Sequence, residues 1–128
     1  MQKILSLDVG KRHTGVAYCD TEIKLAMPLD TIDHEEVEEL VEAVSVLVKE
    51  REISILVIGM PLFMSGEESE QTRYTKIVAE LIKEKCPESA IEFIDERGTS
   101  NMPQLQKSKD PNAQAATEIL RMFIKRNF

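Results

Sequence analysis

An apolar run between two segments of helical periodicity is the feature that most constrains how this chain folds. Residues 53–58 are rich in β-branched side chains and are interrupted by a single serine. Runs of this kind are typical of strands that helices cover on both faces, as in parallel sheets. Apolar residues recur at helical spacing on both sides of the run, at Val37, Leu40, Val41, Val44, Leu47 and Val48 before it and at Tyr74, Ile77, Val78, Leu81 and Ile82 after it. A buried strand between two helices predicts an α/β fold.

Further strands and a third helix complete the predicted order. Three short strands, at 3–8, 14–19 and 22–26, follow one another and predict an antiparallel meander. Residues 91–94 predict a fifth strand, and an apolar repeat over 116–123 predicts the third helix. The order β-β-β-α-β-α-β-α therefore predicts a mixed five-stranded sheet with helices on both faces.

Capping residues and prolines support these boundaries. Asp33 with Glu36 predicts the start of the first helix, and Asn112 is placed to cap the third. The second helix should stop before Pro87, because a proline disfavours helix in the residue that precedes it. No repeat or linker divides the sequence, so we expect a single domain over residues 1–128.

Polar residues stand where the predicted parallel strands end. Strands joined through helices pair in parallel by right-handed crossovers, so the first, fourth and fifth strands should be neighbours. Ligands of such sheets bind beyond the carboxyl ends of the parallel strands. Those ends carry Asp8, Gly59-Met60-Pro61 and Asp95-Glu96-Arg97. We therefore expect the three segments to meet at one edge of the sheet.

Two carboxylates at that edge indicate a metal site. Asp8 with Glu96 or Asp95 would bring like charges together, which is unfavourable unless a cation holds them. Oxygen ligands suit Mg²⁺ or Mn²⁺, and two such ions about 4 Å apart can activate a water for phosphodiester hydrolysis. Neighbouring residues of a strand point to opposite faces, and we take Glu96 as the ligand. Arg97 is suited to a phosphate, the alternative being a salt bridge to Asp95.

The turn that follows Asp8 is bounded by glycines and is basic. Glycines allow a tight turn and the close approach of a ligand. Lys11, Arg12 and His13 lie between them and can follow the backbone of a nucleic acid. The alternatives are an Asp8 that merely caps a hairpin turn and a His13 that is only a turn residue.

Two later segments carry hydroxyl groups within reach of the same edge. Ser65 with Gly66 predicts a mobile loop over the site or, alternatively, a solvated loop. Thr99 and Ser100 would bond a phosphate or cap a turn, and the sequence does not separate these readings.

The charge balance limits the class of protein. A net charge of −7 argues against gripping nucleic acid by bulk electrostatics, while binding through metal ions and a local basic patch stays open. Six of the ten residues 33–42 are Asp or Glu, which is typical of a helix face remote from a site. Cys19 and Cys86 lack metal-ligand spacing and indicate reduced, buried cysteines. With no apolar stretch of membrane length and no secretion signal, we expect a cytoplasmic protein.

Five segments together carry the resemblance to a known family. They are Leu7-Asp8-Val9-Gly10 with Gly15-Val16-Ala17, Ala26-Met27-Pro28-Leu29, Val57-Ile58-Gly59-Met60-Pro61-Leu62 with Ser65-Gly66, Asp95-Glu96-Arg97-Gly98-Thr99-Ser100, and Ala115-Ala116 with Ile119-Leu120. In this order, and over nearly its whole length, the chain resembles the YqgF family of the RNase H-like superfamily, whose relatives are the Holliday-junction resolvases.

The resemblance implies an RNase H-like fold and a metal-dependent nuclease of the bacterial cytoplasm. The family is associated with maturing the 5′ end of the small-subunit (16S) ribosomal RNA precursor, and cleavage of four-way DNA junctions is the earlier proposal for it. By motif, the family's first acid falls on Asp8 and its second on Glu96. The implied partners are nucleic acid and ribosomal assembly particles, bound by a monomer or a weak homodimer.

The third acid of the family's site is where this sequence departs from the pattern. The family has an Asp three residues before the first alanine of its Ala-Ala pair, and Asn112 occupies that position here. Either Asp110 binds the metal instead, or Asn112 lends a neutral oxygen and a second ion binds weakly, or the chain binds nucleic acid without cleaving it. A further reading, the phosphate loop of an actin-like ATPase, requires a second domain that 128 residues cannot hold.

Overall fold

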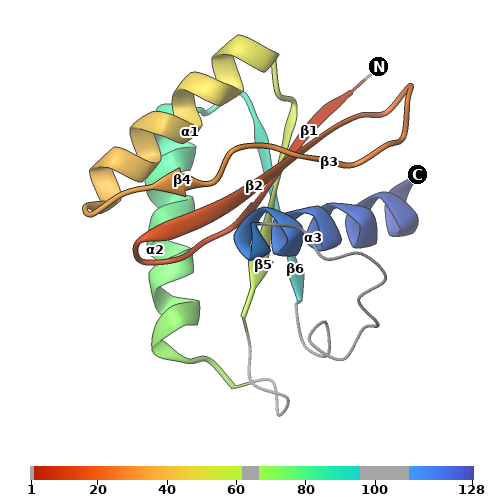
Figure 1. Cartoon of the computed structure of the whole chain (residues 1–128). Coiled ribbons are helices and arrows are strands. Elements are labelled where there is room, and N and C mark those ends of the chain that lie inside the picture. Colours follow the sequence, from red (N-terminus) through yellow and green to blue (C-terminus); the bar gives the residue numbers. More distant parts are fainter. Residues whose placement is uncertain (1, 62–66, 96–109) are drawn as a thin grey trace.

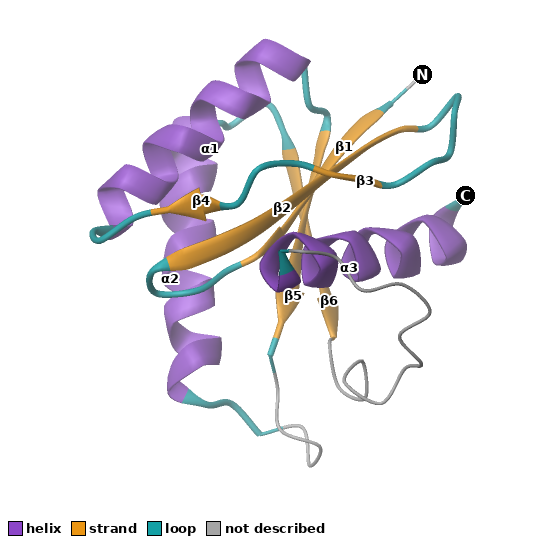
Figure 2. Cartoon of the chain, viewed as in Figure 1, coloured by secondary structure: helices purple, strands orange, loops and turns teal. Residues whose placement is uncertain are grey.

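A mixed β-sheet lies at the centre of the computed structural model, which describes residues 2–61, 67–95 and 110–128 (Figure 1). Within these described ranges, three helices pack against the sheet (Figure 2). The elements are β1 Lys3–Asp8, β2 His13–Asp20, β3 Met27–Pro28, β4 Ile32–Asp33, α1 Val37–Arg51, β5 Ile55–Met60, α2 Glu70–Lys85, β6 Ala90–Asp95 and α3 Pro111–Asn127.

The strand order is β3-β2-β1-β5-β6, and β4 pairs with β2 outside this path. β1 is antiparallel to β2 and parallel to β5, and β5 is parallel to β6. The prediction of three parallel neighbours is therefore confirmed. Their carboxyl ends, at Asp8, Met60 and Asp95, lie at the same edge of the sheet.

Each face of the sheet is buried under helices, as predicted. On one face, β1 and β5 contribute Leu5, Leu7, Leu56 and Ile58 to a core shared with α1 and α2. The alternate residues of the same strands face α3, in a core that comprises Ile4, Ala17, Cys19, Ala26, Val57, Ile94, Ala116, Ile119, Leu120 and Phe123. This alternation assigns every residue of β1, β5 and β6 to one face or the other.

The predicted third strand at 22–26 is wrong, because these residues form a turn. The amides of Ile23 and Lys24 both donate to the carbonyl oxygen of Asp20, over 3.0 and 2.9 Å. Lys24 adopts the left-handed conformation, with a φ of 58°. After this turn the chain pairs with β2 twice, through the short strands β3 and β4, so the described sheet has six strands where five were predicted.

Two predicted helix caps are also wrong. Helix α1 is capped by Glu36, whose side chain forms a capping box with Glu39, whereas Asp33 belongs to β4. Helix α3 is capped by Asp110, because Pro111 takes up the first helical position, where its missing N–H costs nothing. Asn112 therefore lies inside the first turn of α3, two positions after the residue that caps it. Among the described residues no helix is long and apolar enough to cross a membrane.

Candidate metal site at the end of β1

Asp8 is the last residue of β1, and its side chain lies on the face that α3 covers. The alternation along β1 puts Ile4, Ser6 and Asp8 on that face. Ser6 ties the strand to the helix directly, since its hydroxyl donates to the carbonyl oxygen of Ala116 over 2.7 Å. The strand is therefore held against α3 two residues before Asp8.

The Asp8 carboxyl group is half-buried and has no partner among the residues that the structure describes. No hydrogen bond or ion pair joins it to any residue in the described part of the chain. Burial raises its pKa from the ordinary value of 3.8 to about 6. A carboxylate in such a position is unfavourable as an isolated charge, and a bound divalent cation would offset that cost. The site therefore suits a metal ion.

Helix α3 begins beside Asp8 because Gly15, the partner of Asp8 on the neighbouring strand, leaves room for the helix. Asp8 pairs with Gly15 in the antiparallel register of β1 and β2. A Cβ atom at Gly15 would lie 1.8 Å from the carbonyl oxygen of Asn112, so only glycine allows the helix to come this close. Asn112, the residue that takes the place of the family's third acid, is thus brought next to the end of β1.

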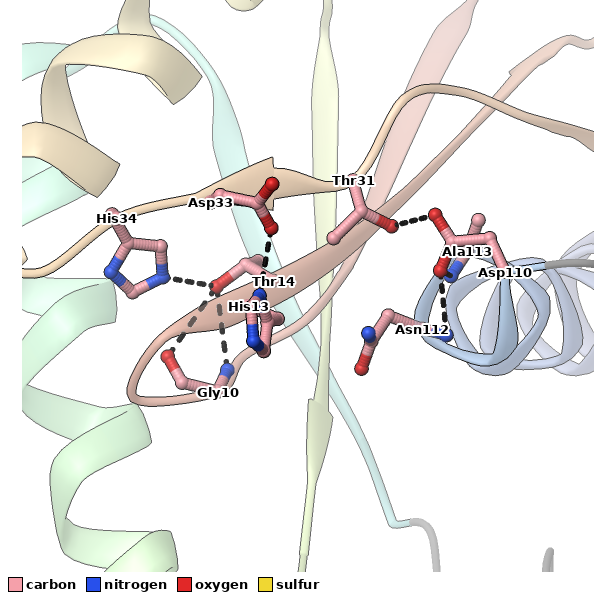
Figure 3. Close-up of polar contacts among 9 residues, drawn as sticks. All are labelled: Gly10, His13, Thr14, Thr31, Asp33, His34, Asp110, Asn112 and Ala113. Carbon is pink, nitrogen blue, oxygen red and sulfur yellow. Dashed lines mark hydrogen bonds and ion pairs between the residues drawn. The ribbon is translucent and has the colours of Figure 1, made fainter.

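Asp110 holds the first turn of α3 together. Its Oδ1 accepts hydrogen bonds from the amides of Asn112 and Ala113, over 3.0 and 3.3 Å. Its Oδ2 accepts a hydrogen bond from the hydroxyl of Thr31, seventy-nine residues earlier in the chain (Figure 3). The Thr31 hydroxyl, followed by these two amides, keeps the pKa of Asp110 below its ordinary value. In this structure the carboxylate serves as a helix cap, and its predicted role as a metal ligand stays a prediction.

Asp95 faces away from Asp8. Along β6, Ile94 packs in the core under α3, whereas Ile91 packs in the core under α1 and α2. The side chain of Asp95 shares the face of Ile91 by alternation, on the opposite side of the sheet from Asp8. This arrangement disfavours Asp95 as the second acid. Glu96 is the remaining candidate, and it lies outside the described residues, as do Arg97, Thr99 and Ser65.

The basic turn between β1 and β2 is exposed at this edge. Lys11, Arg12 and His13 are all exposed, as a nucleic-acid contact requires. Nδ1 of His13 lies 2.7 Å from Oδ1 of Asp33 (Figure 3). Asp33 was predicted to lie on a solvent face remote from the site, and this is wrong, because the pairing of β4 with β2 carries it to the turn.

Sequence analysis missed several residues that shape the turn. The side-chain amide of Gln71, in α2, donates to the carbonyl oxygen of Val9 over 2.7 Å. Thr14 is fully buried, and its hydroxyl lies 3.0 Å from Nε2 of His34. Single polar residues in short or helical segments give no periodic signal, so only the tertiary structure reveals these contacts. Within the described residues, no three His, Cys, Asp or Glu side chains form a complete metal cluster.

Two resolvases are among the solved structures that share this fold. RuvC of T. thermophilus in complex with a Holliday junction substrate superposes with a TM-score of 0.71 at 12% identity, covering 98% of this chain and 96% of that one. The fowlpox virus Holliday junction resolvase superposes with a TM-score of 0.55 at 11% identity, covering 98% of this chain and 99% of that one. The predicted fold class is confirmed: the chain is an RNase H-like α/β protein.

The family follows from sequence similarity. A family model described as RuvX, Holliday junction resolvase, matches residues 2–126. A protein of Sulfurihydrogenibium sp. (strain YO3AOP1) named "Putative pre-16S rRNA nuclease" is 38% identical over 97% of this chain and 87% of its own length. A protein of the same name from Chloroflexus aurantiacus is 40% identical over 77% of this chain and 64% of its own length. The chain belongs to the RuvX (YqgF) family, and the resemblance stated from its motifs is confirmed.

Proposed function

We propose that this protein is a metal-dependent endonuclease that hydrolyses a phosphodiester bond in the precursor of 16S ribosomal RNA. The observation that carries the proposal is Asp8, a half-buried carboxyl group without a partner in the described part of the chain, at the end of β1. The motif resemblance makes it the expected first acid of the site. The curated relatives are named as pre-16S rRNA nucleases, which supports this substrate. We place the reaction in the cytoplasm, on nucleic acid within assembling ribosomal particles.

Asp8 and Glu96 would hold Mg²⁺ or Mn²⁺, with an oxygen from Asp110 or Asn112 as a third ligand. A divalent ion held by these residues would supply an activated water and would neutralise charge on the scissile phosphate. The chain's own residues position the substrate: Lys11 and Arg12 contact its backbone from the exposed turn. Three more substrate contacts are proposed from the sequence, namely Ser65, Arg97 and Thr99.

A second candidate function is the cleavage of four-way DNA junctions, which the family description and the RuvC fold support. A third candidate is a binding module without turnover, which Asn112 supports because an amide brings no charge to a second ion. Competition between RNA and junction DNA separates the first two, and metal dependence separates both from the third.

The decisive experiment is cleavage of a pre-16S RNA fragment in the presence of Mn²⁺ or Mg²⁺ by the natural chain and by Asp8→Asn. We expect the natural chain to cut only with a divalent metal and Asp8→Asn to be inactive but folded. The matched control is Glu88→Gln, which removes an exposed carboxylate just before the opposite end of β6 and should leave cleavage unchanged. Full activity of Asp8→Asn would remove the proposal, and binding of RNA without cleavage would favour the binding module.

A further inference from the structure

The edge of the sheet at which Asp8 ends β1 is called the Asp8 edge below. The short segment of residues 31–34, which includes β4, contacts the structure on both sides of it. One side is the first turn of α3, and the other is the turn that joins β1 to β2. The segment pairs with β2 at His13 and Thr14, so it runs across the mouth of that turn. Figure 3 shows its side chains extending toward both sides.

On the α3 side, the contact is made by Thr31. Its hydroxyl donates to Oδ2 of Asp110, while Oδ1 of the same carboxylate accepts the amides of Asn112 and Ala113. One carboxylate therefore joins the 31–34 segment to the backbone of the first helical turn. Since the carbonyl oxygen of Asn112 rests against Gly15, opposite Asp8, the rotation of this turn determines what α3 presents to Asp8.

On the other side, the contact is made by His34. Its Nε2 lies 3.0 Å from the hydroxyl of Thr14, which also accepts the amide of Gly10 over 3.3 Å and faces the Gly10 carbonyl oxygen at 3.5 Å. The backbone amide of His34 donates to the carbonyl oxygen of Arg12 over 2.9 Å. Gly10 is only two residues beyond Asp8, so these bonds fix the course of the backbone directly after Asp8.

The tautomer of His34 follows from its surroundings. The residue is 4% exposed, and its Nδ1 is buried without a hydrogen-bond partner among the described residues. A buried N–H without an acceptor is rarer and costlier than an acceptor without a donor, so the proton belongs on Nε2. Nε2 then donates to Thr14, and the Thr14 hydroxyl is left to donate to Gly10.

From these contacts we infer that Thr31 and Thr14 are positioning residues for the metal site. Each hydroxyl connects the 31–34 segment to one side of the Asp8 edge: Thr31 sets the first turn of α3 and Thr14 sets the turn after β1. The inference rests on the proposed function, in that it takes the Asp8 edge to be the metal site. Neither hydroxyl binds the metal itself, and both act through the groups that they hold.

Paired substitutions at Thr31 test the inference. Thr31→Val keeps the shape of the side chain and removes the hydroxyl, whereas Thr31→Ser keeps the hydroxyl. Titration of the purified protein with Mn²⁺ alone, followed by the thermal unfolding midpoint, reports metal binding without any turnover. We expect Thr31→Val to raise the Mn²⁺ concentration for half-maximal stabilisation about tenfold, the effect typical of residues that orient a metal's ligands. Thr31→Ser should restore the natural value.

The same pair at Thr14 tests the other side. Thr14→Val should raise the Mn²⁺ midpoint and Thr14→Ser should restore it, with kcat for RNA cleavage falling in the valine variant more than KM rises. An unchanged midpoint in both valine variants overturns the inference, as do equal effects of valine and serine, which would indicate packing alone. Where a valine variant does not fold, the corresponding alanine variant at a lower temperature provides the comparison.

The outcomes separate this inference from the proposed function. A natural chain that binds Mn²⁺ but cuts no RNA contradicts the nuclease, while the Mn²⁺ midpoints of the four variants still decide the positioning roles. A natural chain that cuts RNA, with valine variants that bind Mn²⁺ and cut equally well, supports the nuclease and overturns the inference. A natural chain that binds no Mn²⁺ overturns both.

Discussion

Gly15 faces Asp8 across the β1–β2 pair and leaves the space in which the carbonyl oxygen of Asn112 rests. A Cβ atom there would lie 1.8 Å from that oxygen, which belongs to the backbone and cannot move without shifting α3. We expect Gly15→Ala to destabilise the protein by about 1–3 kcal/mol, the usual cost of overpacking. Urea unfolding measures this cost, and an unchanged midpoint would mean that α3 does not press against β2 as described.

The ionised Asp8 carboxylate should lower the stability of the metal-free protein. Its pKa of about 6 in the folded protein exceeds the ordinary value of 3.8, so ionisation disfavours the folded state. Stability present below pH 4 is therefore lost as the pH rises through about 6, and the rise in pKa corresponds to at most about 3 kcal/mol.

Asp8→Asn removes this cost, because the amide carries no charge. Without metal, we expect the variant to be more stable than the natural chain above pH 6 and similar to it near pH 4. Chemical unfolding over this pH range tests the expectation. Saturating Mn²⁺ should stabilise the natural chain and reduce the difference. A variant that is less stable at pH 7 would contradict a strained, uncompensated Asp8.

His34 should make the fold sensitive to acid in the opposite direction. Burial lowers its pKa below the ordinary 6.5; Glu39 and Asp33 oppose this effect, and His13 adds to it. The unfolded chain thus binds a proton more readily than the folded one, and stability falls as the pH drops below 6.5.

His34→Gln tests this contribution, since glutamine retains a donor for Thr14 but cannot be protonated. We expect the stability difference between the natural chain and His34→Gln to be constant well above pH 6.5 and to move in favour of the variant as the pH falls below 6.5. Unfolding midpoints at matched pH values measure it. A constant difference over the whole range would show that His34 is protonated equally in both states.

Alanine substitutions at Asp110 and Asn112 should differ in their effect on the free energy of unfolding, because only Asp110 caps α3. Asp110 accepts two backbone amides and the Thr31 hydroxyl, whereas Asn112 is an interior residue of the first turn. We expect Asp110→Ala to cost about 1–2 kcal/mol, as the loss of a cap does, and Asn112→Ala to cost clearly less. Equal losses of unfolding free energy in the two variants, measured by urea unfolding, would contradict Asp110 as the cap that stabilises α3.

The sequence was sufficient to predict the elements that rest on hydrophobic periodicity. The run at 53–58 and the two flanking helical patterns led to the three parallel strands, and its place at the end of the first apolar strand made Asp8 the candidate metal ligand, which stays a prediction. Two-residue strands such as β4 have no periodicity to detect. The link from Thr31 to Asp110 joins positions that only the folded chain brings together. The Asp110 cap had a local signal, because Pro111 prefers the first helical position and makes its predecessor the cap.

Asn112→Asp should place a stronger metal ligand, a carboxylate, in the first turn of α3. The first turn lies beside Asp8 because Gly15 admits it, so a carboxylate at 112 adds negative charge where Asp8 is already strained. Without metal the like charges repel, and we expect the variant to be less stable than the natural chain above pH 6. With Mn²⁺ the order should reverse, because three carboxylates hold a divalent ion more tightly than two carboxylates and an amide.

Thermal unfolding with and without Mn²⁺, beside RNA cleavage, measures both effects of Asn112→Asp. Cleavage by the natural chain and by the variant, with a lower Mn²⁺ requirement in the variant, would show that two acids and a neutral oxygen suffice. Cleavage by the variant alone would show that the natural chain is a binding module. No change in Mn²⁺ affinity would mean that position 112 does not contribute to the site, and that the third ligand is Asp110 or a residue elsewhere.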